Sequence, residues 1–192
     1  MKRLLLALIA GVSSMAALAQ TPATPTADDG QWVRPAKDFQ STRFSSLAQI
    51  TTANVGQLKL AMQYTTGLSR GQEAAPIVAD NTMFVVGPYP NPVWAFDLTK
   101  PGFPLKWRFD PQPKNADSTT YGGGVAAAGD RVYIGSGYGE VLALDAASGK
   151  PVWRVKVNAP IHSPPTVAND RVFVVTVENE LDVLSAIDGH KL

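Results

Sequence analysis

Few side chains in this 192-residue sequence have types and spacings that could do chemistry together. Cysteine is absent, which excludes disulfides and zinc or iron–sulfur sites with cysteine ligands. The two histidines, His162 and His190, are too few and too far apart along the chain for a metal cluster. The glycines at 122–124 precede a predicted strand instead of a helix, so they do not form a phosphate cradle. Glu73 is an isolated carboxylate at a predicted strand start, either solvated or paired with Arg70, and no catalytic residue is predicted from these residues alone.

The first residues have the three-part pattern of a secretory signal peptide. Lys2 and Arg3 give a positive start, residues 4–12 form a short apolar run, and residues 17–19 supply the small side chains that signal peptidase requires. The apolar run is too short to span a bilayer as a permanent helix. No cysteine follows the cleavage site to carry a lipid. We therefore expect residues 1–19 to be cleaved, the protein to be periplasmic, and no transmembrane span to remain.

The composition after residue 19 is that of a leader followed by one domain. Residues 20–31 are rich in Thr, Pro, Ala and Asp, which bury little apolar surface. We expect a flexible leader over residues 20–37 and a folded domain over residues 38–192, which is long enough for a hydrophobic core. The net charge of +1 indicates no nucleic-acid partner.

The sequence repeats a unit of strands and turns, and such a repeat determines the fold. In the clearest copy, a turn at Gly129-Asp130 lies between two apolar runs, and the other two copies have their turns at Asp80-Asn81 and Asn169-Asp170. Short apolar runs separated by Gly, Asp or Asn predict short antiparallel strands. The glycines Gly149 and Gly189 set a period of 40 residues, which is typical of a β-propeller blade.

We predict an all-β fold, a partial β-propeller of about three four-stranded antiparallel blades over residues 75–110, 123–157 and 164–192. The alternative is a β-sandwich, which has no need of such a period. Each blade alone exposes two apolar faces, so we expect a tryptophan to fill the gap between neighbours. Its indole N–H would donate a hydrogen bond to a backbone carbonyl of the neighbouring blade, and a glycine would let the ring approach the backbone closely. The residues assigned to this tryptophan docking are Trp107, Asp145, Gly149, Trp153 and Gly189.

The pattern Ala143-x-Asp145-x-x-Ser148-Gly149-x-x-x-Trp153 resembles the tryptophan-docking motif of PQQ-type propellers. Residues 38–110 also resemble the start of a PQQ-dependent (quinoprotein) alcohol or methanol dehydrogenase. The stretches that carry this likeness include Arg43-Phe44-Ser45-Ser46-Leu47 and Arg70-Gly71-Gln72-Glu73. The resemblance implies pyrroloquinoline quinone (PQQ) as a cofactor and Glu73 as a residue that contacts the quinone.

Two landmarks of those dehydrogenases are missing. Asp117 and Ser118 stand where the family has a vicinal cysteine pair, and Gly123 stands where it has an arginine that meets the quinone. In the family, the metal ligands and the carboxylate base come from later blades. We therefore expect no metal site in this chain and no dehydrogenase activity from it alone, and the sequence leaves open whether it is part of an enzyme.

Residues 121–192 resemble a different relative, the propeller subunit of the outer-membrane β-barrel assembly machinery. The matching stretches are residues 121–125, 135–141 and 174–180. That relative binds no quinone and is a scaffold for other proteins. The resemblance implies a second function, a non-catalytic propeller that binds protein partners through strand edges or loops.

The predicted ring of blades is incomplete. The third copy stops at Leu192, one residue before the position of its docking tryptophan. Residues 58–64 look like the outer strand of an earlier blade, with Met62 at the tryptophan position. Three blades leave two large faces uncovered. We expect further C-terminal blades or a protein partner to cover them.

Overall fold

The computed structural model describes residues 30–112 and 123–192, and their regular structure is almost entirely β. The first sheet contains β1 (Ile77–Ala79), β2 (Thr82–Val86), β3 (Val93–Asp97) and β4 (Leu105–Phe109). The second contains β5 (Val125–Ala128), β6 (Arg131–Ser136), β7 (Glu140–Asp145) and β8 (Pro151–Lys156). The third contains β9 (Thr166–Ala168), β10 (Arg171–Val175) and β11 (Leu181–Ser185). Among the described residues, the one helical element is a 3₁₀ turn at Val55–Gln57.

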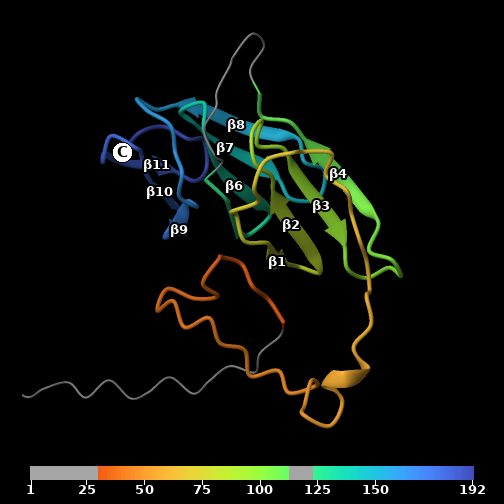
Figure 1. Cartoon of the computed structure of the whole chain (residues 1–192). Coiled ribbons are helices and arrows are strands. Elements are labelled where there is room, and N and C mark those ends of the chain that lie inside the picture. The colour runs from red at the N-terminus through yellow and green to blue at the C-terminus, as the bar shows by residue number, and fades with distance from the viewer. Residues whose placement is uncertain (1–29, 113–122) are drawn as a thin grey trace, which may run out of the picture.

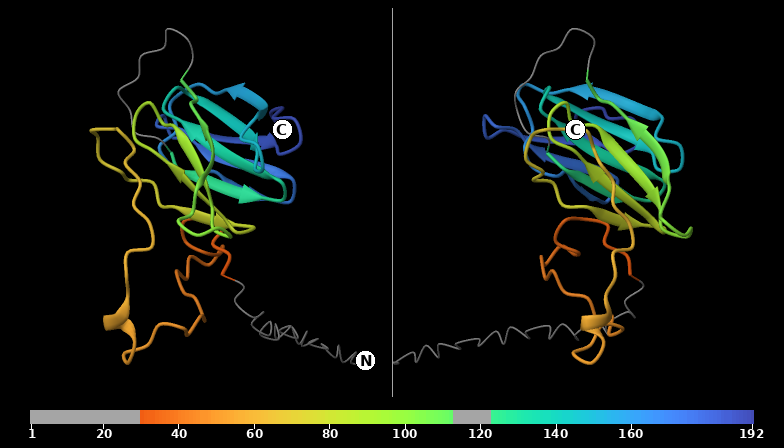
Figure 2. Two further views of the ribbon diagram at one scale, coloured as in Figure 1. Left: turned by 90° about the vertical axis from the view of Figure 1, so that its right-hand side faces the viewer. Right: turned by 45° about the vertical axis from the view of Figure 1, so that its right-hand side comes forward.

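In each sheet the strands are antiparallel and pair in chain order, and the three sheets are stacked one against the next (Figures 1 and 2). This confirms the predicted all-β class and antiparallel pairing. The third sheet has three strands where four were expected. After β11, the described residues add an isolated bridge between Leu184 and Lys191, which is too short to count as a strand.

Two-residue turns join the first two strands of the first and third sheets, at the predicted positions. Asp80 and Asn81 have φ values of 46° and 55°, and Asn169 and Asp170 have φ values of 49° and 57°. Asn and Asp tolerate this left-handed backbone better than other non-glycine residues, and a turn of this kind matches the twist of a hairpin. The local sequence therefore determines where each blade turns.

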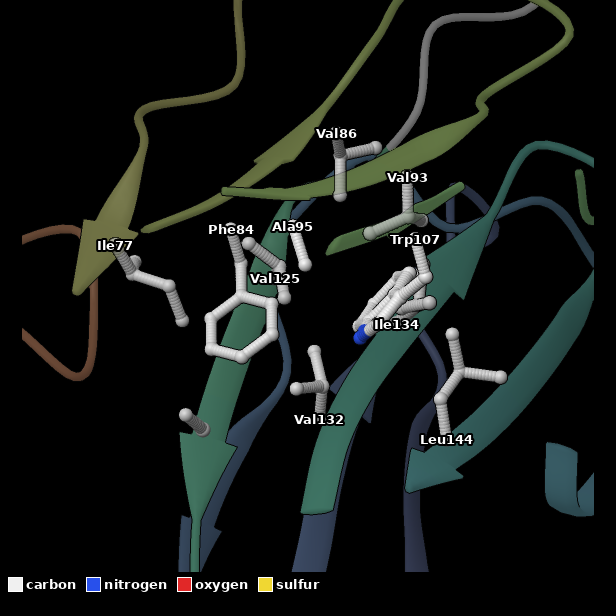
Figure 3. Close-up of a cluster of buried hydrophobic side chains, with 11 residues drawn as sticks. Ile77, Phe84, Val86, Val93, Ala95, Trp107, Val125, Val132, Ile134 and Leu144 are labelled. Carbon is white, nitrogen blue, oxygen red and sulfur yellow. The ribbon is translucent and has the colours of Figure 1, made fainter. Parts of the chain in front are cut away.

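The second sheet has both faces covered, because it lies between the other two. Along β6, Val132 and Ile134 belong to a core cluster shared with the first sheet, whereas Tyr133 belongs to a cluster shared with the third. Successive side chains of a strand point to opposite faces, so one strand serves both interfaces. Figure 3 shows the first of these clusters, in which Trp107 of β4 lies among side chains of the second sheet.

The first strand of each sheet, namely β1, β5 or β9, is its innermost strand, and the segment before the first sheet pairs with two of these three. Trp32 and Val78 of β1 exchange two backbone hydrogen bonds of 2.8 and 3.0 Å, and the Ala127 N–H of β5 donates to the Val33 carbonyl at 3.1 Å. Trp32 and Val33, which lie in the expected leader, thus pair with the edges of β1 and β5. The expected bounds of the leader and the domain stay predictions. The predicted signal peptide lies outside the described residues and stays a prediction.

Residues 58–64 do not form the outer strand that the sequence predicted. A strand needs a hydrogen-bonded neighbour, and no described strand pairs with this stretch. Tyr64 instead sets its ring edge-on against Trp94 and Phe96 of β3, with centroids 6.1 and 5.0 Å apart, and Met62 is half-buried. The stretch thus packs on the first sheet through side chains.

Candidate functional site

Two tryptophans reach from the last strand of one sheet to a turn of the next. The indole Nε1–H of Trp107 on β4 donates to the Ala146 carbonyl at 3.0 Å. The Nε1–H of Trp153 on β8 donates to the Ala186 carbonyl at 3.1 Å. Each acceptor lies directly after the third strand of the neighbouring sheet, so the two hydrogen bonds occupy equivalent positions in the repeat.

Glycines lie against both rings. Gly149 and Gly189 have φ values of 71° and 80°, a backbone conformation that L side chains rarely adopt. A Cβ on Gly149 would lie 2.6 Å from the Trp107 ring, and a Cβ on Gly189 would lie 2.8 Å from the Trp153 ring. Both positions therefore require glycine for two reasons, the backbone conformation and the space.

The turn that carries Gly149 is closed by an acidic side chain. The Asp145 carboxylate accepts hydrogen bonds from the Ser148 hydroxyl at 2.5 Å and from the Ser148 N–H at 2.7 Å. The hydroxyl bond is the main reason that the pKa of Asp145 lies below its ordinary value. In the third sheet the two residue types are exchanged. Ser185 is at the position equivalent to Asp145, and Asp188 is at the position equivalent to Ser148. The hydrogen bond from Ser185, followed by that from His190, lowers the pKa of Asp188 to about 2.

The first sheet has a related turn at Asp97. Its carboxylate accepts hydrogen bonds from the Thr99 hydroxyl at 2.5 Å and the Thr99 N–H at 3.0 Å, and Lys100 Nζ lies 3.0 Å away. The Thr99 hydroxyl and then Lys100 lower the pKa of Asp97 from 3.8 to about 2. Because the folded-state pKa lies below the unfolded one, this stabilisation is present above about pH 4 and is lost as the pH falls through about 2.

Removing the Thr99 hydroxyl should therefore raise the pKa of Asp97. We expect Thr99→Ala to shift it toward its ordinary value, whereas Thr99→Ser, which keeps the hydroxyl, should leave it near 2. An NMR titration of the Asp97 carboxyl carbon measures both variants. An unchanged pKa of Asp97 in Thr99→Ala would show that the hydroxyl is not the main cause.

Glu73 lines an open cavity of about 500 Å³. Its wall comes from four separate parts of the chain: the segment before the first sheet and the stretches that lead into β1, β5 and β9. The lining residues are Trp32, Pro35, Arg43, Glu73, Ala74, Ala75, Gly123, Gly124, His162 and Pro164.

The strand register explains why these stretches meet. Ile77, Ala126 and Thr166 pair with the third residue of β2, β6 and β10, respectively, so they are equivalent positions on the innermost strands. Glu73 and His162 each lie four residues before such a position. Strands β1, β5 and β9 are neighbours in space, and the cavity lies where these three strands begin.

The charged groups of the cavity have no partner within the described part of the chain. Glu73, Arg43 and His162 are exposed, and among residues 30–112 and 123–192 none of their side chains takes part in a hydrogen bond or ion pair. Among the described residues no ion pair joins Arg70 to Glu73, so this alternative is not observed, and the Arg70 Cζ lies 5.4 Å from the ring centroid of Tyr89. An arginine, a histidine and a carboxylate around one cavity can bind a polar ligand.

Sequence reasoning identified Glu73 and missed the other two groups. The sequence indicated no metal site at His162 or His190 and therefore predicted no role for His162. Arg43 was noted only as the first residue of the stretch Arg43-Phe44-Ser45-Ser46-Leu47. The one signal that could have identified His162 is its place in the repeat, equivalent to that of Glu73. Gly123 also lines the cavity, and a Cβ there would lie 2.6 Å from the Ser163 carbonyl oxygen. The substituted positions Asp117 and Ser118 lie outside the described residues.

Within residues 30–112 and 123–192, no three His, Cys, Asp or Glu side chains are grouped so that they could hold a metal ion. In the same part of the chain, no helix is long and apolar enough to cross a membrane.

Comparison with known proteins establishes the family. Residues 91–192, more than half of the chain, match a PQQ-repeat family whose description is "Outer membrane protein assembly factor BamB". The chain belongs to the PQQ-repeat β-propeller family. The likeness inferred from the docking motif is thereby confirmed.

Relatives of this PQQ-repeat chain include dehydrogenases. A lanthanide-dependent methanol dehydrogenase from Methylacidiphilum fumariolicum (strain SolV) is 34% identical over 86% of this chain. A 1-butanol dehydrogenase (cytochrome c) from Thauera butanivorans is 40% identical over 68% of it. The chain spans 29% and 19% of the lengths of these two relatives, so their activities describe much longer proteins.

Solved structures confirm that this PQQ-repeat chain has a propeller fold. A europium-containing methanol dehydrogenase superposes with a TM-score of 0.73 at 32% identity, over 84% of this chain and 31% of the other. The quinohemoprotein alcohol dehydrogenase ADHIIG from Pseudomonas putida HK5 gives 0.75 at 32% identity, over 84% and 26%. BamB from Moraxella catarrhalis gives 0.50 at 20% identity, over 65% and 35%, and this likeness shows the fold alone.

Proposed function

We propose that this chain is part of a periplasmic propeller of the quinoprotein alcohol dehydrogenase type, and that Glu73 contacts bound PQQ. The observation that carries the proposal is the position of Glu73 in the cavity where the three innermost strands begin. The similarity to alcohol and methanol dehydrogenases supports it. The periplasmic location rests on the predicted signal peptide at residues 1–19.

The residues around the cavity fit such a cofactor in kind. A volume of about 500 Å³ lies within the range of about 300–1,000 Å³ usual for small-molecule sites. Gly123 and Gly124 keep part of the wall free of side chains, and the Glu73 carboxylate can accept a hydrogen bond from the ligand. When bound, the quinone supplies an electrophile that accepts hydride from an alcohol. This chain's own residues hold and orient it.

We propose that dehydrogenase activity requires more of such a propeller than this chain contains. The chain spans less than a third of the length of the dehydrogenases it matches. By resemblance, the metal ligands and the carboxylate base belong to later blades. Glu73 is therefore assigned to cofactor binding, and no residue of this chain is assigned to catalysis.

Titration with PQQ tests the role of Glu73. We expect the full chain to give a saturable change in quinone absorbance, and Glu73→Gln to weaken binding about tenfold through loss of a charge-assisted hydrogen bond. Glu178→Gln is the matched control, because Glu178 is exposed in the β10–β11 turn, away from the cavity. No saturable change, or equal affinities for the two variants, would contradict the role of Glu73.

We also propose that Trp107 and Trp153 dock neighbouring blades, with Gly149 and Gly189 admitting the rings and Asp145 closing the turn. The cross-sheet hydrogen bonds of 3.0 and 3.1 Å support this role. A large aromatic ring buried between two sheets contributes area, and its N–H requires an acceptor.

A second candidate function is a scaffold for protein partners. Two observations favour it, namely the match to the BamB-described family and the exposed apolar side chains before the first sheet. Phe39, Phe44 and Leu60 are 59%, 68% and 80% exposed. Co-purification with an identified outer-membrane β-barrel assembly protein, lost in Phe44→Asp, would support a scaffold. Failure of purified assembly proteins to bind the chain would exclude this candidate.

A further inference from the structure

We propose that Arg43 and His162 bind the carboxylate groups of an aromatic polycarboxylate ligand in the Glu73 cavity. This inference rests on the proposed function, because it concerns the same cavity and names the groups that would recognise its ligand. The family's quinone-contacting arginine has no counterpart at Gly123. Gly123 and Arg43 line the same cavity. Arg43 can therefore supply a guanidinium to this cavity, although glycine replaces the family's arginine at position 123.

Arg43 is held at the cavity by the turn that precedes it. Its N–H donates to the Ala36 carbonyl at 3.2 Å, and its φ of 52° turns the chain back. Asp38, the acidic residue of this turn, accepts hydrogen bonds from the Thr42 hydroxyl at 2.5 Å and the Thr42 N–H at 3.0 Å. Among residues 30–112 and 123–192, no ion pair joins Arg43 to Asp38 or to another acidic side chain, so none of these carboxylates competes with a ligand for the guanidinium.

His162 follows a rigid anchor. The preceding residue, Ile161, is fully buried, its N–H donates to the Ser136 carbonyl at 3.1 Å, and it forms a bridge with Thr176. These contacts fix the backbone next to His162, whose side chain lines the cavity. Imidazole N–H groups can donate to a carboxylate.

The charges of the cavity define the ligand class. Arg43 offers a fork of donors that matches a carboxylate in a bidentate manner, and His162 offers a further donor. Among the described residues that line the cavity, Glu73 is the single acidic one, and its carboxylate can accept a hydrogen bond from a polar group of the ligand. Trp32, Pro35 and Pro164 supply apolar surface suited to a flat ring system. The best match is thus a planar molecule with two or more carboxylates and a separate hydrogen-bond donor.

Calorimetric titration of the full chain tests this assignment. The probes are PQQ, its trimethyl ester, and benzene-1,3,5-tricarboxylate as a carboxylate without a quinone. We expect Arg43→Gln and His162→Gln each to weaken PQQ binding about tenfold or more, and the ester to bind correspondingly more weakly than PQQ. Arg171→Gln and His190→Gln are matched controls away from the cavity and should retain wild-type affinity. Thermal melting of every variant confirms that it is folded.

The outcomes separate this inference from the proposed function. If PQQ binds and neither cavity variant is weaker than its control, the carboxylate assignment is wrong while the quinone proposal stands. If the tricarboxylate binds in an Arg43-dependent way and PQQ does not, the carboxylate assignment holds and the quinone proposal is wrong. If neither molecule binds the folded wild-type chain, both are wrong.

Discussion

Replacing Gly149 by alanine should lower the free energy of unfolding by about 3 kcal/mol. Two costs add at this position. The φ of 71° costs an L residue about 1–2 kcal/mol, and the new Cβ would lie 2.6 Å from the Trp107 ring. Relieving that overlap requires displacement of a packed side chain, which costs about 1–3 kcal/mol. Urea denaturation followed by tryptophan fluorescence measures the loss.

Gly102 offers a matched control for this substitution. Its φ is 74°, and no atom lies within 4 Å of the Cβ that alanine would add. Gly102→Ala should therefore incur the backbone cost alone, about 1–2 kcal/mol. Equal losses of unfolding free energy in Gly149→Ala and Gly102→Ala would mean that the Trp107 ring is not in close contact with Gly149. That result would contradict the proposal that Gly149 leaves room for this ring.

Truncation of Trp153 to alanine should lower the free energy of unfolding by about 3–5 kcal/mol. The side chain is 8% exposed and belongs to the core cluster between the second and third sheets. Its ring packs against Tyr133, with centroids 6.0 Å apart, and its indole N–H bonds the Ala186 carbonyl. Since the third sheet contacts the second through this cluster, we expect it to separate first, seen as early loss of amide protection in β9–β11.

Two further variants separate the causes. Trp153→Phe keeps an aromatic ring and removes the N–H, so the loss beyond the smaller ring's area should be about 1 kcal/mol. Phe44→Ala truncates an aromatic residue that is 68% exposed and should change stability by less than about 0.5 kcal/mol. A Trp153→Ala variant as stable as Phe44→Ala would remove the claim that this tryptophan holds two blades together.

The turns of the repeat could be predicted because their causes are local. Asp80-Asn81 and Asn169-Asp170 lie between short apolar runs and adopt left-handed backbone, which Asn and Asp tolerate, so the hairpins appear at the expected positions. The alternation of apolar residues along β6 needs no knowledge of distant segments. A strand without a partner is different. Residues 58–64 have a strand-like pattern, yet no described strand pairs with them.

The residues proposed to bind a ligand could be predicted only in part. Glu73 was found through a motif that surrounds it in sequence. Arg43 and His162 are separated by 119 positions and share no motif, so nothing local connects them. The exchange of Asp and Ser between the second and third turns was also missed, because the hydrogen bond that survives the exchange is visible only in three dimensions.

The amino-acid sequence alone therefore established a repeated antiparallel blade and its turns, since strand alternation and turn chemistry act over a few residues. The cavity and the pairing of Trp32 and Val33 with β1 and β5 followed only from the stacked sheets. Stacking brings the starts of β1, β5 and β9 together because each blade must bury two apolar faces. Residues that precede those strands meet as a consequence of packing, and their own neighbours in the chain carry no sign of it.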